Sequence, residues 1–182
     1  WRVMAIIKPN NNTLSAVTAL PAAITTGDVL QVVSTKKSSS FTTTANAWTA
    51  VTGFNVDITP SATSSKVYVL VTCGSFQTDN GNARAQMKLM RDSTDIALGD
   101  AATGAEVSSV VCGRSNDGAH HQFPTVISVL DSPSTTSQIN YKIYVQRGAD
   151  QAGVICFNRS GNQDANSGNT ISTITVMEIK GW

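Results

Sequence analysis

The sequence has little charge. Charged residues make up 14% of its 182 residues, the net charge is +1, and the longest basic run is the pair Lys36-Lys37. Nucleic-acid-binding proteins usually show a basic stripe along one face. We therefore expect no nucleic acid partner and no strong electrostatic field that would steer charged ligands.

Cysteine is also scarce. Cys73, Cys112 and Cys156 lie far apart, and no CxxC pair is present. An odd number of cysteines at long spacings does not suit a disulfide framework, and a zinc site needs more closely grouped ligands. Because Cys73 and Cys112 lie in apolar runs, we expect buried thiols and assembly in a reducing compartment.

Long apolar stretches are missing as well. No segment approaches the ~20 apolar residues of a membrane-spanning helix. The apolar run over residues 3–7 is too short for the core of a signal peptide. We expect no membrane insertion.

Ser, Thr, Asn and Gly take the place of the missing charges and favour strands and turns over helices. From residue 28 onward, short apolar or alternating segments recur at roughly 8–12-residue intervals with turn clusters between them, which is typical of a sandwich or barrel. No long segment shows the 3.6-residue apolar period of a helix. The pattern predicts an all-β, antiparallel β-sandwich. Its predicted strands are 29–35, 40–44, 49–52, 55–59, 66–74, 84–91, 96–98, 106–112, 125–130, 140–146, 153–157 and 171–179.

The first 27 residues differ from the rest. Pro9, followed by three asparagines, breaks this segment, and Pro21 interrupts a mildly apolar stretch over 14–24. We predict a short extended N-terminal arm over 1–27, followed by one β-sandwich domain over 28–182. The arm is expected to lie on its own domain, on a neighbour or on a larger assembly, and a disordered leader is the alternative.

The alternation of side chains indicates which strand faces are covered. The segment 84–91 predicts one apolar face and one polar face, the latter made of Arg84, Gln86 and Lys88. The segments 67–73, 126–130 and 171–179 are apolar on both faces, yet a two-layer sandwich buries only its inner faces. Another subunit, or loops of a monomer, must cover the second face, and we favour an oligomer. Candidate interface residues are Tyr68, Leu70, Ile127, Tyr144, Ile174 and Val176.

No catalytic constellation stands out. His120 and His121 are adjacent in one loop, so at most one of them can serve a given serine, and the G-x-S-x-G pattern is absent. Nothing marks two carboxylates as the pair that a glycosidase requires. We therefore expect no enzyme activity and no cofactor, with a glycan-active enzyme as the alternative.

Two loops have some character of metal sites. The pair His120-His121 would need further ligands from elsewhere. The loop 162–168 spaces oxygen side chains two residues apart, as an EF-hand loop begins. Its glycine falls one position late, however, and it has no glutamate for bidentate binding. A solvated loop and a polar turn are the simpler interpretations, so no metal site is predicted.

The order of several short segments resembles a known family. These segments are VLQVVST at 29–35, VTGF at 51–54, ITPS at 58–61, LDSP at 130–133 and the closing ISTITVMEI at 171–179. Over roughly residues 28–180 the chain resembles small tailed-phage virion proteins and fibre-tip domains. The resemblance implies a jelly-roll-like β-sandwich similar in shape to C1q and TNF domains. It also implies a homotrimer, assembled in the cytoplasm of a bacterial host and located at the virion surface.

The resemblance implies a phage virion structural protein whose sandwich, on the tail or fibre, presents loops to a host-surface glycan or protein. Loops on a rigid scaffold often hold recognition residues. Because the arm has no collagen-like or heptad stalk, the alternative is a capsid decoration or head-fibre protein that residues 1–27 anchor to the shell and other virion proteins. A cellular C1q/TNF-like signalling domain is a further alternative, against which the missing signal peptide argues. Candidate receptor contacts are Asp79, Asn80, Asn82, Asn116, Asp117, His120, His121, Asn162, Asp164 and Asn166.

Overall fold

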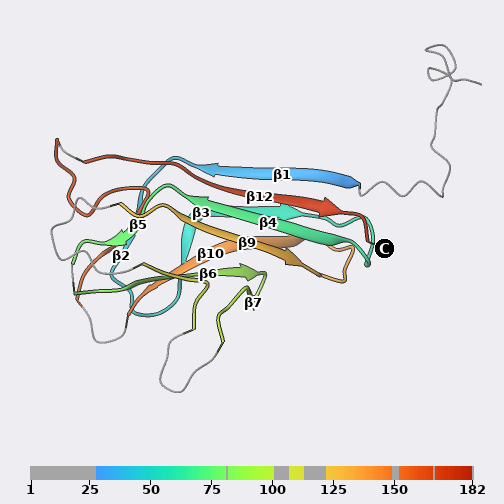
Figure 1. The fold of residues 1–182 in the computed structure, drawn as a ribbon, viewed down its shortest axis with the longest axis horizontal. Coiled ribbons are helices and arrows are strands. Elements are labelled where there is room, and N and C mark those ends of the chain that lie inside the picture. The colour runs from blue at the N-terminus through green and yellow to red at the C-terminus, as the bar shows by residue number, and fades with distance from the viewer. Residues whose placement is uncertain are drawn as a thin grey trace, which may run out of the picture.

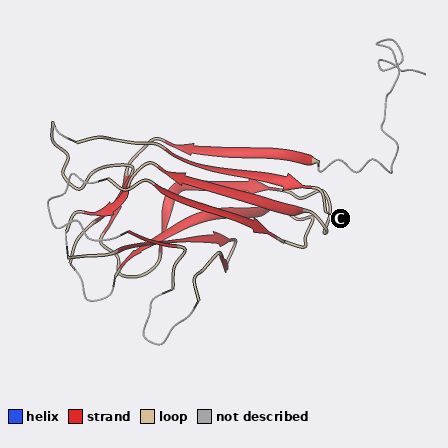
Figure 2. Cartoon of the chain, in the orientation of Figure 1, coloured by secondary structure: helices blue, strands red, loops and turns tan. Residues whose placement is uncertain are grey.

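The computed structural model describes residues 28–80, 82–100, 107–112, 122–148, 152–165 and 167–181. Within these ranges all regular secondary structure is β-strand, and no helix is present (Figure 2). The all-β prediction is therefore confirmed. The predicted arm over 1–27 lies outside the described residues, so the domain boundary at residue 28 stays a prediction.

The strands form two main sheets and one small sheet, and every strand pair is antiparallel (Figure 1). The first sheet, here the β12 sheet, has the order β1-β12-β4-β9. The second, the β10 sheet, has the order β3-β10-β6-β7, with β8 paired to β6. The small sheet has the order β2-β11-β5. The strand bounds are β1 Val29–Lys37, β2 Phe41–Thr43, β3 Thr49–Ile58, β4 Lys66–Cys73, β5 Phe76–Thr78, β6 Ala85–Arg91, β7 Thr94–Ile96, β8 Val110–Cys112, β9 Thr125–Asp131, β10 Ile139–Arg147, β11 Ile155–Phe157 and β12 Ser172–Ile179.

The pairing of the long strands follows a simple rule. β1 pairs with β12, β3 with β10, β4 with β9, and β6 with β7. Each pair lies inside the previous one along the sequence, as if one long hairpin had been rolled up. This nesting produces the two-sheet jelly roll, so the jelly-roll-like sandwich is the observed fold.

The core lies between the two main sheets. Val67, Val69 and Val71 of β4 are fully buried on one side, and Phe54 and Ile143 of the other sheet belong to the same core cluster. Burying each such side chain stabilises the fold by about 1.5–3 kcal/mol. The small sheet extends this core at one end, where the Phe157 ring lies 5.3 Å from that of Phe54 between centroids.

Two strand predictions needed correction. The segments predicted at 49–52 and 55–59 form one strand, β3, which contains a β-bulge. The partner of β3 changes from Asn55 opposite Lys142 to Ala50 opposite Tyr144, and Gly53 within the bulge has a φ of 71°, which glycine adopts without strain. The strand β5 was not predicted, because its three residues are too few to show an alternation.

The prediction of which side of β9 and β12 faces a partner was wrong. Ile127, Ile174 and Val176, proposed as interface residues, are buried in the core. The residues on the opposite side of these strands, among them Leu130 and Met177, face outward. Both sides of these strands are apolar, so alternation separated the two faces but did not show which one meets the other sheet.

The polar side predicted for β6 is also not fully exposed to solvent. Gln86 and Lys88 are buried. The Gln86 Oε1 accepts a hydrogen bond of 2.7 Å from Gln146 Nε2, and the Lys88 ammonium lies over the Trp48 ring. A neighbouring strand and a loop tryptophan therefore cover a face that the sequence alone assigned to solvent.

All three cysteines are free and buried, as predicted. Burial raises the pKa of Cys73 to about 12 and that of Cys156 to about 11, and it raises the pKa of Cys112 as well. Nucleophilic chemistry and metal binding require the thiolate. These thiols stay protonated at neutral pH and act as small core residues.

Candidate functional site

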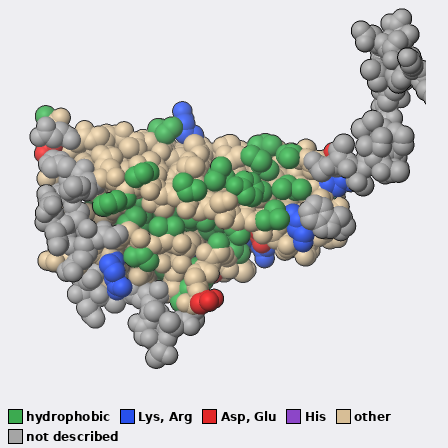
Figure 3. Space-filling view, viewed as in Figure 1, with side chains coloured by type: hydrophobic (Ala, Val, Ile, Leu, Met, Phe, Trp, Pro, Cys, Tyr) green, Lys and Arg blue, Asp and Glu red, His purple; other side chains and the backbone are tan. Residues whose placement is uncertain are grey.

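The outer side of the β12 sheet carries a row of apolar side chains. The strand register places Val32, Met177, Tyr68 and Leu130 next to one another across all four strands. Val32 is 57% exposed and Leu130 is 51% exposed. Figure 3 shows hydrophobic side chains spread over the region of these strands.

Further apolar residues extend this row in both directions. The adjacent register row holds Ser34, Thr175 and Ser128, with Leu70 of β4 between Thr175 and Ser128. Large apolar side chains exposed on such a scale mark interaction surfaces. Tyr68 and Leu70, two of the predicted interface residues, do lie on this outer side and are partly exposed. We call the whole set the apolar face: Val29, Leu30, Val32, Tyr68, Leu70, Val126, Leu130, Ile171, Met177 and Ile179.

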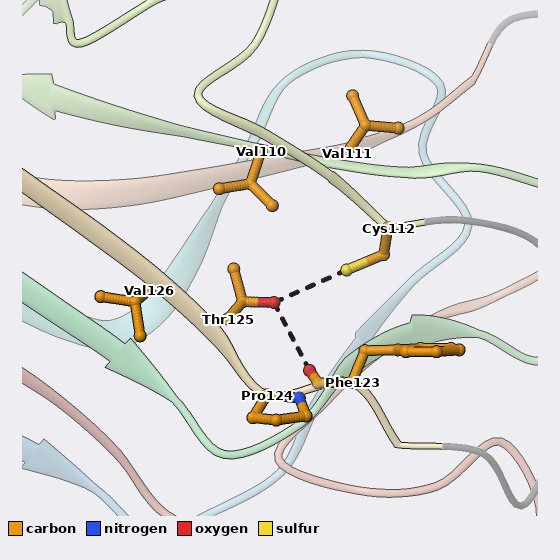
Figure 4. A pocket seen from close by; sticks show the side chains of 7 residues that line it. All are labelled: Val110, Val111, Cys112, Phe123, Pro124, Thr125 and Val126. Atoms are coloured by element: carbon orange, nitrogen blue, oxygen red, sulfur yellow. Dashed lines mark hydrogen bonds between the residues drawn. The ribbon is translucent and has the colours of Figure 1, made fainter.

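A pocket of about 350 Å³ opens beside this face, between two strand edges (Figure 4). Its lining comes from β8, β9 and the residues just before β9: Val110, Val111, Cys112, Phe123, Pro124, Thr125 and Val126. β9 is the last strand of its sheet and β8 pairs only with β6. The Cys112 Sγ lies 3.6 Å from the Thr125 Oγ1. The pocket is thus a recess at the open side of the sandwich, lined mostly by apolar residue types together with exposed backbone, and we call it the edge pocket.

The outer side of the β10 sheet has a different character. Lys88 lies between two aromatic rings, with its Nζ 4.7 Å from the centroid of Trp48 and 6.0 Å from that of Tyr144. The same Nζ lies 2.7 Å from Asp95 Oδ1. Lys142 Nζ lies 5.7 Å from the Tyr144 centroid. Tyr144, predicted to lie at an interface, therefore belongs to a polar and aromatic surface, here the polar face.

The described parts of the predicted receptor loops come together at one end of the sandwich. Lys37, Ser172, Cys73 and Thr125 are aligned across the β12 sheet, so the chain segments next to them emerge at the same end. We call this the loop end. The Gln122 Nε2 donates to the Gly168 carbonyl across 2.9 Å, which joins two of these loops.

The described candidate contacts form hydrogen bonds within the protein. Asn80 Oδ1 accepts a hydrogen bond of 2.9 Å from Asn82 N, the local bond that Asn usually makes in a turn. Asp79 Oδ1 instead accepts one of 2.6 Å from Val154 N, which joins its turn to a segment distant in the sequence. Asn162 and Asp164 are exposed in the same loop as Gly168. Their contact with a receptor stays a prediction, and Asn116, Asp117, His120, His121 and Asn166 lie outside the described residues.

Asn158 is the central residue of the loop end, and no sequence pattern predicted this role. It is fully buried and has a φ of 59°. Its Nδ2 donates to the carbonyl of Lys37 at 2.9 Å, and its Oδ1 accepts a hydrogen bond of 2.5 Å from Ser172 Oγ. Its N–H donates to the Ser75 carbonyl at 2.9 Å. One asparagine therefore connects β1, β12 and the segments around the small sheet, and it gives the loops a rigid support.

Two carboxylates, one partly buried and one fully buried, close the opposite end. Asp131 of β9 accepts hydrogen bonds from Arg91 Nη1 to both of its oxygens, at 2.8 and 2.7 Å, and from Tyr141 Oη at 2.7 Å. Arg91 and Tyr141 belong to the β10 sheet, so these bonds fasten the two sheets to each other. Burial, together with the hydrogen bond to Asp131, raises the pKa of Tyr141 and keeps the phenol neutral.

Glu178 of β12 is the second carboxylate. It is 1% exposed and accepts hydrogen bonds from Ser61 N, Ser61 Oγ, Ser65 Oγ and Gln31 Nε2 at 2.6–2.7 Å. Burial alone raises its pKa, but the hydrogen bonds outweigh burial and lower the pKa to about 2. The carboxylate therefore stays charged and holds the loop between β3 and β4 against β1.

No group of three or more His, Cys, Asp or Glu among the described residues is placed to hold a metal ion. The described part of the chain contains no helix of the length and apolarity needed to cross a membrane.

Comparison with known proteins gives limited similarity. No family model and no curated protein matches the sequence. A structure of the infectious bursal disease virus Gx strain is similar over 90% of this chain, with 13% identity and a TM-score of 0.41. The VP2 subviral particle of infectious bursal disease virus is similar over 91%, with 11% identity and a TM-score of 0.40. This chain spans less than half of each, 41% and 46%. Similarity at this level does not establish a shared function.

Proposed function

We propose that this protein is a structural component of a phage virion, with no enzymatic activity, that assembles through the apolar face. The apolar face is the observation that carries the proposal. It lies on the outer side of a sheet whose inner side already covers the core. Monomeric proteins rarely expose contiguous apolar patches of more than a few hundred Å², so a partner chain is the expected cover.

The molecule offers two apolar surfaces of different shape, the apolar face and the edge pocket with exposed Val111 and Val126 beside it. An interface between two different surfaces is heterologous, and such an interface forms a ring where the rotation between subunits closes and an open filament where it does not. We propose that it closes into a ring of identical subunits. The resemblance implies that the ring is a homotrimer.

The loop end is the part we propose to contact the host, with a tail or fibre as its location. The register places the first residues of β1 beside Ile179 and the last beside Ser172. The chain before β1 therefore enters at the end opposite the loops. Attachment to the particle through residues 1–27 and presentation of the loops can then occur at opposite ends of the same domain.

The placement of the chain entry and the loops at opposite ends also supports the second candidate function, a capsid decoration or head-fibre protein anchored by residues 1–27. The two functions differ in whether the loop end binds a host molecule. An adsorption assay separates them: purified protein at saturation should compete with phage for host cells if the loops bind the receptor. Absence of competition would exclude the receptor role and leave decoration.

The assembly itself is tested by light scattering and by loading onto particles. The purified chain should have a mass near three times 19.1 kDa, and a mass of a single chain would overturn the oligomer. Deletion of residues 1–27 should prevent incorporation into particles while the sandwich still folds. Normal incorporation of the truncated chain would contradict the anchor.

A further inference from the structure

Two aromatic side chains lie on the polar face, away from the core. Trp48 comes directly before β3 and is half-buried, and Tyr144 lies in the middle of β10 and is also half-buried. The register places Tyr144 between Lys88 of β6 and Ala50 of β3. Ala50 is small and exposed, so little side-chain volume stands beside the Tyr144 ring on that side.

Lys88 fixes the two rings in place. Its ammonium is held by Asp95 at 2.7 Å and contacts both ring systems, and the residue is only 8% exposed. Cation–π interactions become stronger when the cation is shielded from water. The rings of Trp48 and Tyr144 are therefore ordered before any ligand arrives, which lowers the entropic cost of binding.

Polar groups of both kinds surround these rings. The Lys142 ammonium contacts the Tyr144 ring and forms no ion pair with any described residue. Asn55 lies opposite Lys142 on β3, and Asp57 accepts a hydrogen bond of 2.6 Å from Asn140 Nδ2. Donors and acceptors thus alternate along one side of the aromatic pair.

We infer that this part of the polar face is a binding site for a neutral saccharide, centred on Trp48 and Tyr144. A sugar ring has an apolar C–H face that stacks on an aromatic ring and a rim of hydroxyls that both donate and accept. The site offers the same combination, an aromatic surface with a few placed polar groups. It is the largest departure of the polar face from a plain solvated sheet.

The charges of the site favour an uncharged ligand. Asp95 neutralises Lys88, and Lys142 is offset by Asp57, two register positions along the same face. A polyanion would need a surplus of basic groups around the rings, whereas the two lysines beside them are matched by Asp95 and Asp57.

The site is separate from the proposed assembly and from the loop end. The apolar face belongs to the other sheet, so a ring built through that face leaves the polar face open to water. The inference therefore does not rest on the proposed function, and each can fail without the other.

The test uses the full chain and three uncharged oligosaccharides: maltohexaose, cellohexaose and chitohexaose. Saturation-transfer NMR and titration calorimetry should detect binding of at least one of them. Trp48→Ala should lower the affinity about tenfold or more, because it removes a stacked ring. Tyr68→Ala is the matched control, since it removes an aromatic ring from the apolar face and should leave sugar binding unchanged.

Three results would overturn the inference: no binding of any of the three sugars, unchanged affinity in Trp48→Ala, or tighter binding of hexagalacturonate than of the neutral sugars. Tyr144→Ala and Lys142→Ala provide a second measurement if Trp48→Ala does not fold, and both should also weaken binding. Light scattering on the same variants reports assembly independently. Loss of sugar binding in an intact oligomer would then locate the effect at the site.

Discussion

The two outer faces of this sandwich differ although they enclose the same core. The β12 sheet presents Val32, Met177, Tyr68 and Leu130 to the outside, whereas the β10 sheet presents a network of lysine, carboxylate and aromatic groups. Apolar side chains enriched in Met and aromatics are typical of the buried centre of protein interfaces, and charged groups are depleted there. The difference teaches that one core can support two outer faces of different chemistry, one mainly apolar and one polar and aromatic.

The largest effect should come from charges placed on the apolar face. The double substitution Val32→Glu and Leu130→Glu should dissociate the proposed oligomer, because two carboxylates would be buried without partners at a cost of several kcal/mol each. The dissociation constant should rise more than about a thousandfold, as measured by light scattering over a dilution series.

The matched control places the same charges on the other sheet, as Thr52→Glu and Asn55→Glu. Both positions are exposed on β3, so the oligomer should persist. If the control pair dissociates the oligomer and the Val32 and Leu130 pair does not, the assignment of the two faces is reversed.

The next effect concerns the fastening between the two sheets. Asp131→Asn should lower the free energy of unfolding by about 3 kcal/mol, because the substitution leaves the Arg91 guanidinium partly buried without its carboxylate. Urea denaturation followed by circular dichroism measures the change. Asp28→Asn, which affects the exposed pair with Lys180, should cost about 1 kcal/mol or less, and equal losses would contradict the special role of Asp131.

Acid should weaken the β12 sheet through Glu178. The folded pKa of about 2 lies below the ordinary value of 4.5, so the stabilisation is fully present above pH 4.5 and is lost as the pH falls towards 2. We expect a loss of about 2 kcal/mol over this range.

Glu178→Gln provides the comparison, since it removes the titrating group and keeps the shape. Urea denaturation midpoints, measured at intervals from about pH 6 down to about pH 2.5, should fall less steeply for this variant than for the natural chain. Parallel pH profiles would show that another carboxylate is responsible.

The smallest effect is expected on the polar face. Lys88→Met keeps the aliphatic stem but removes the cation between Trp48 and Tyr144, and it should cost about 0.5–1 kcal/mol. A double-mutant cycle with Trp48→Ala isolates the contact. A coupling energy near zero would mean that the lysine does not order the rings.

The fold could be predicted largely from the sequence because the strands of a sandwich produce a local sequence pattern. Alternation and turn clusters located the long strands to within one or two residues, as for β4 and β12. When both sides of a strand are apolar, its sequence pattern does not show which side faces the core. Ile174 and Met177 are equally apolar, and only the register with β4 and the presence of the second sheet decide that Ile174 faces inward.

The surfaces were harder to predict because they join distant residues. Trp48 and Lys88 are forty positions apart, and each alone suggests nothing more than a core aromatic and a wet lysine. Asn158 comes directly after the short strand β11. Its role as a support of the loops depends on hydrogen bonds to the carbonyls of Lys37 and Ser75, which are distant in the sequence. The turn residues of the described loops, such as Asp79 and Asn162, do lie between strands as predicted, and their contacts with a receptor are still a prediction.

The place of β12 in the sheet also determines the order of events on the ribosome. β12 lies between β1 and β4, yet it is translated after every other described strand. Until residues 172–179 emerge, β1 has no neighbour in its sheet and the side of β4 opposite β9 is unpaired. Such long-range pairing is slow and leaves incomplete chains prone to aggregation. The β12 sheet can therefore form only after all the described strands have been translated. An assembly built on its outer face would contain only subunits in which these strands are present.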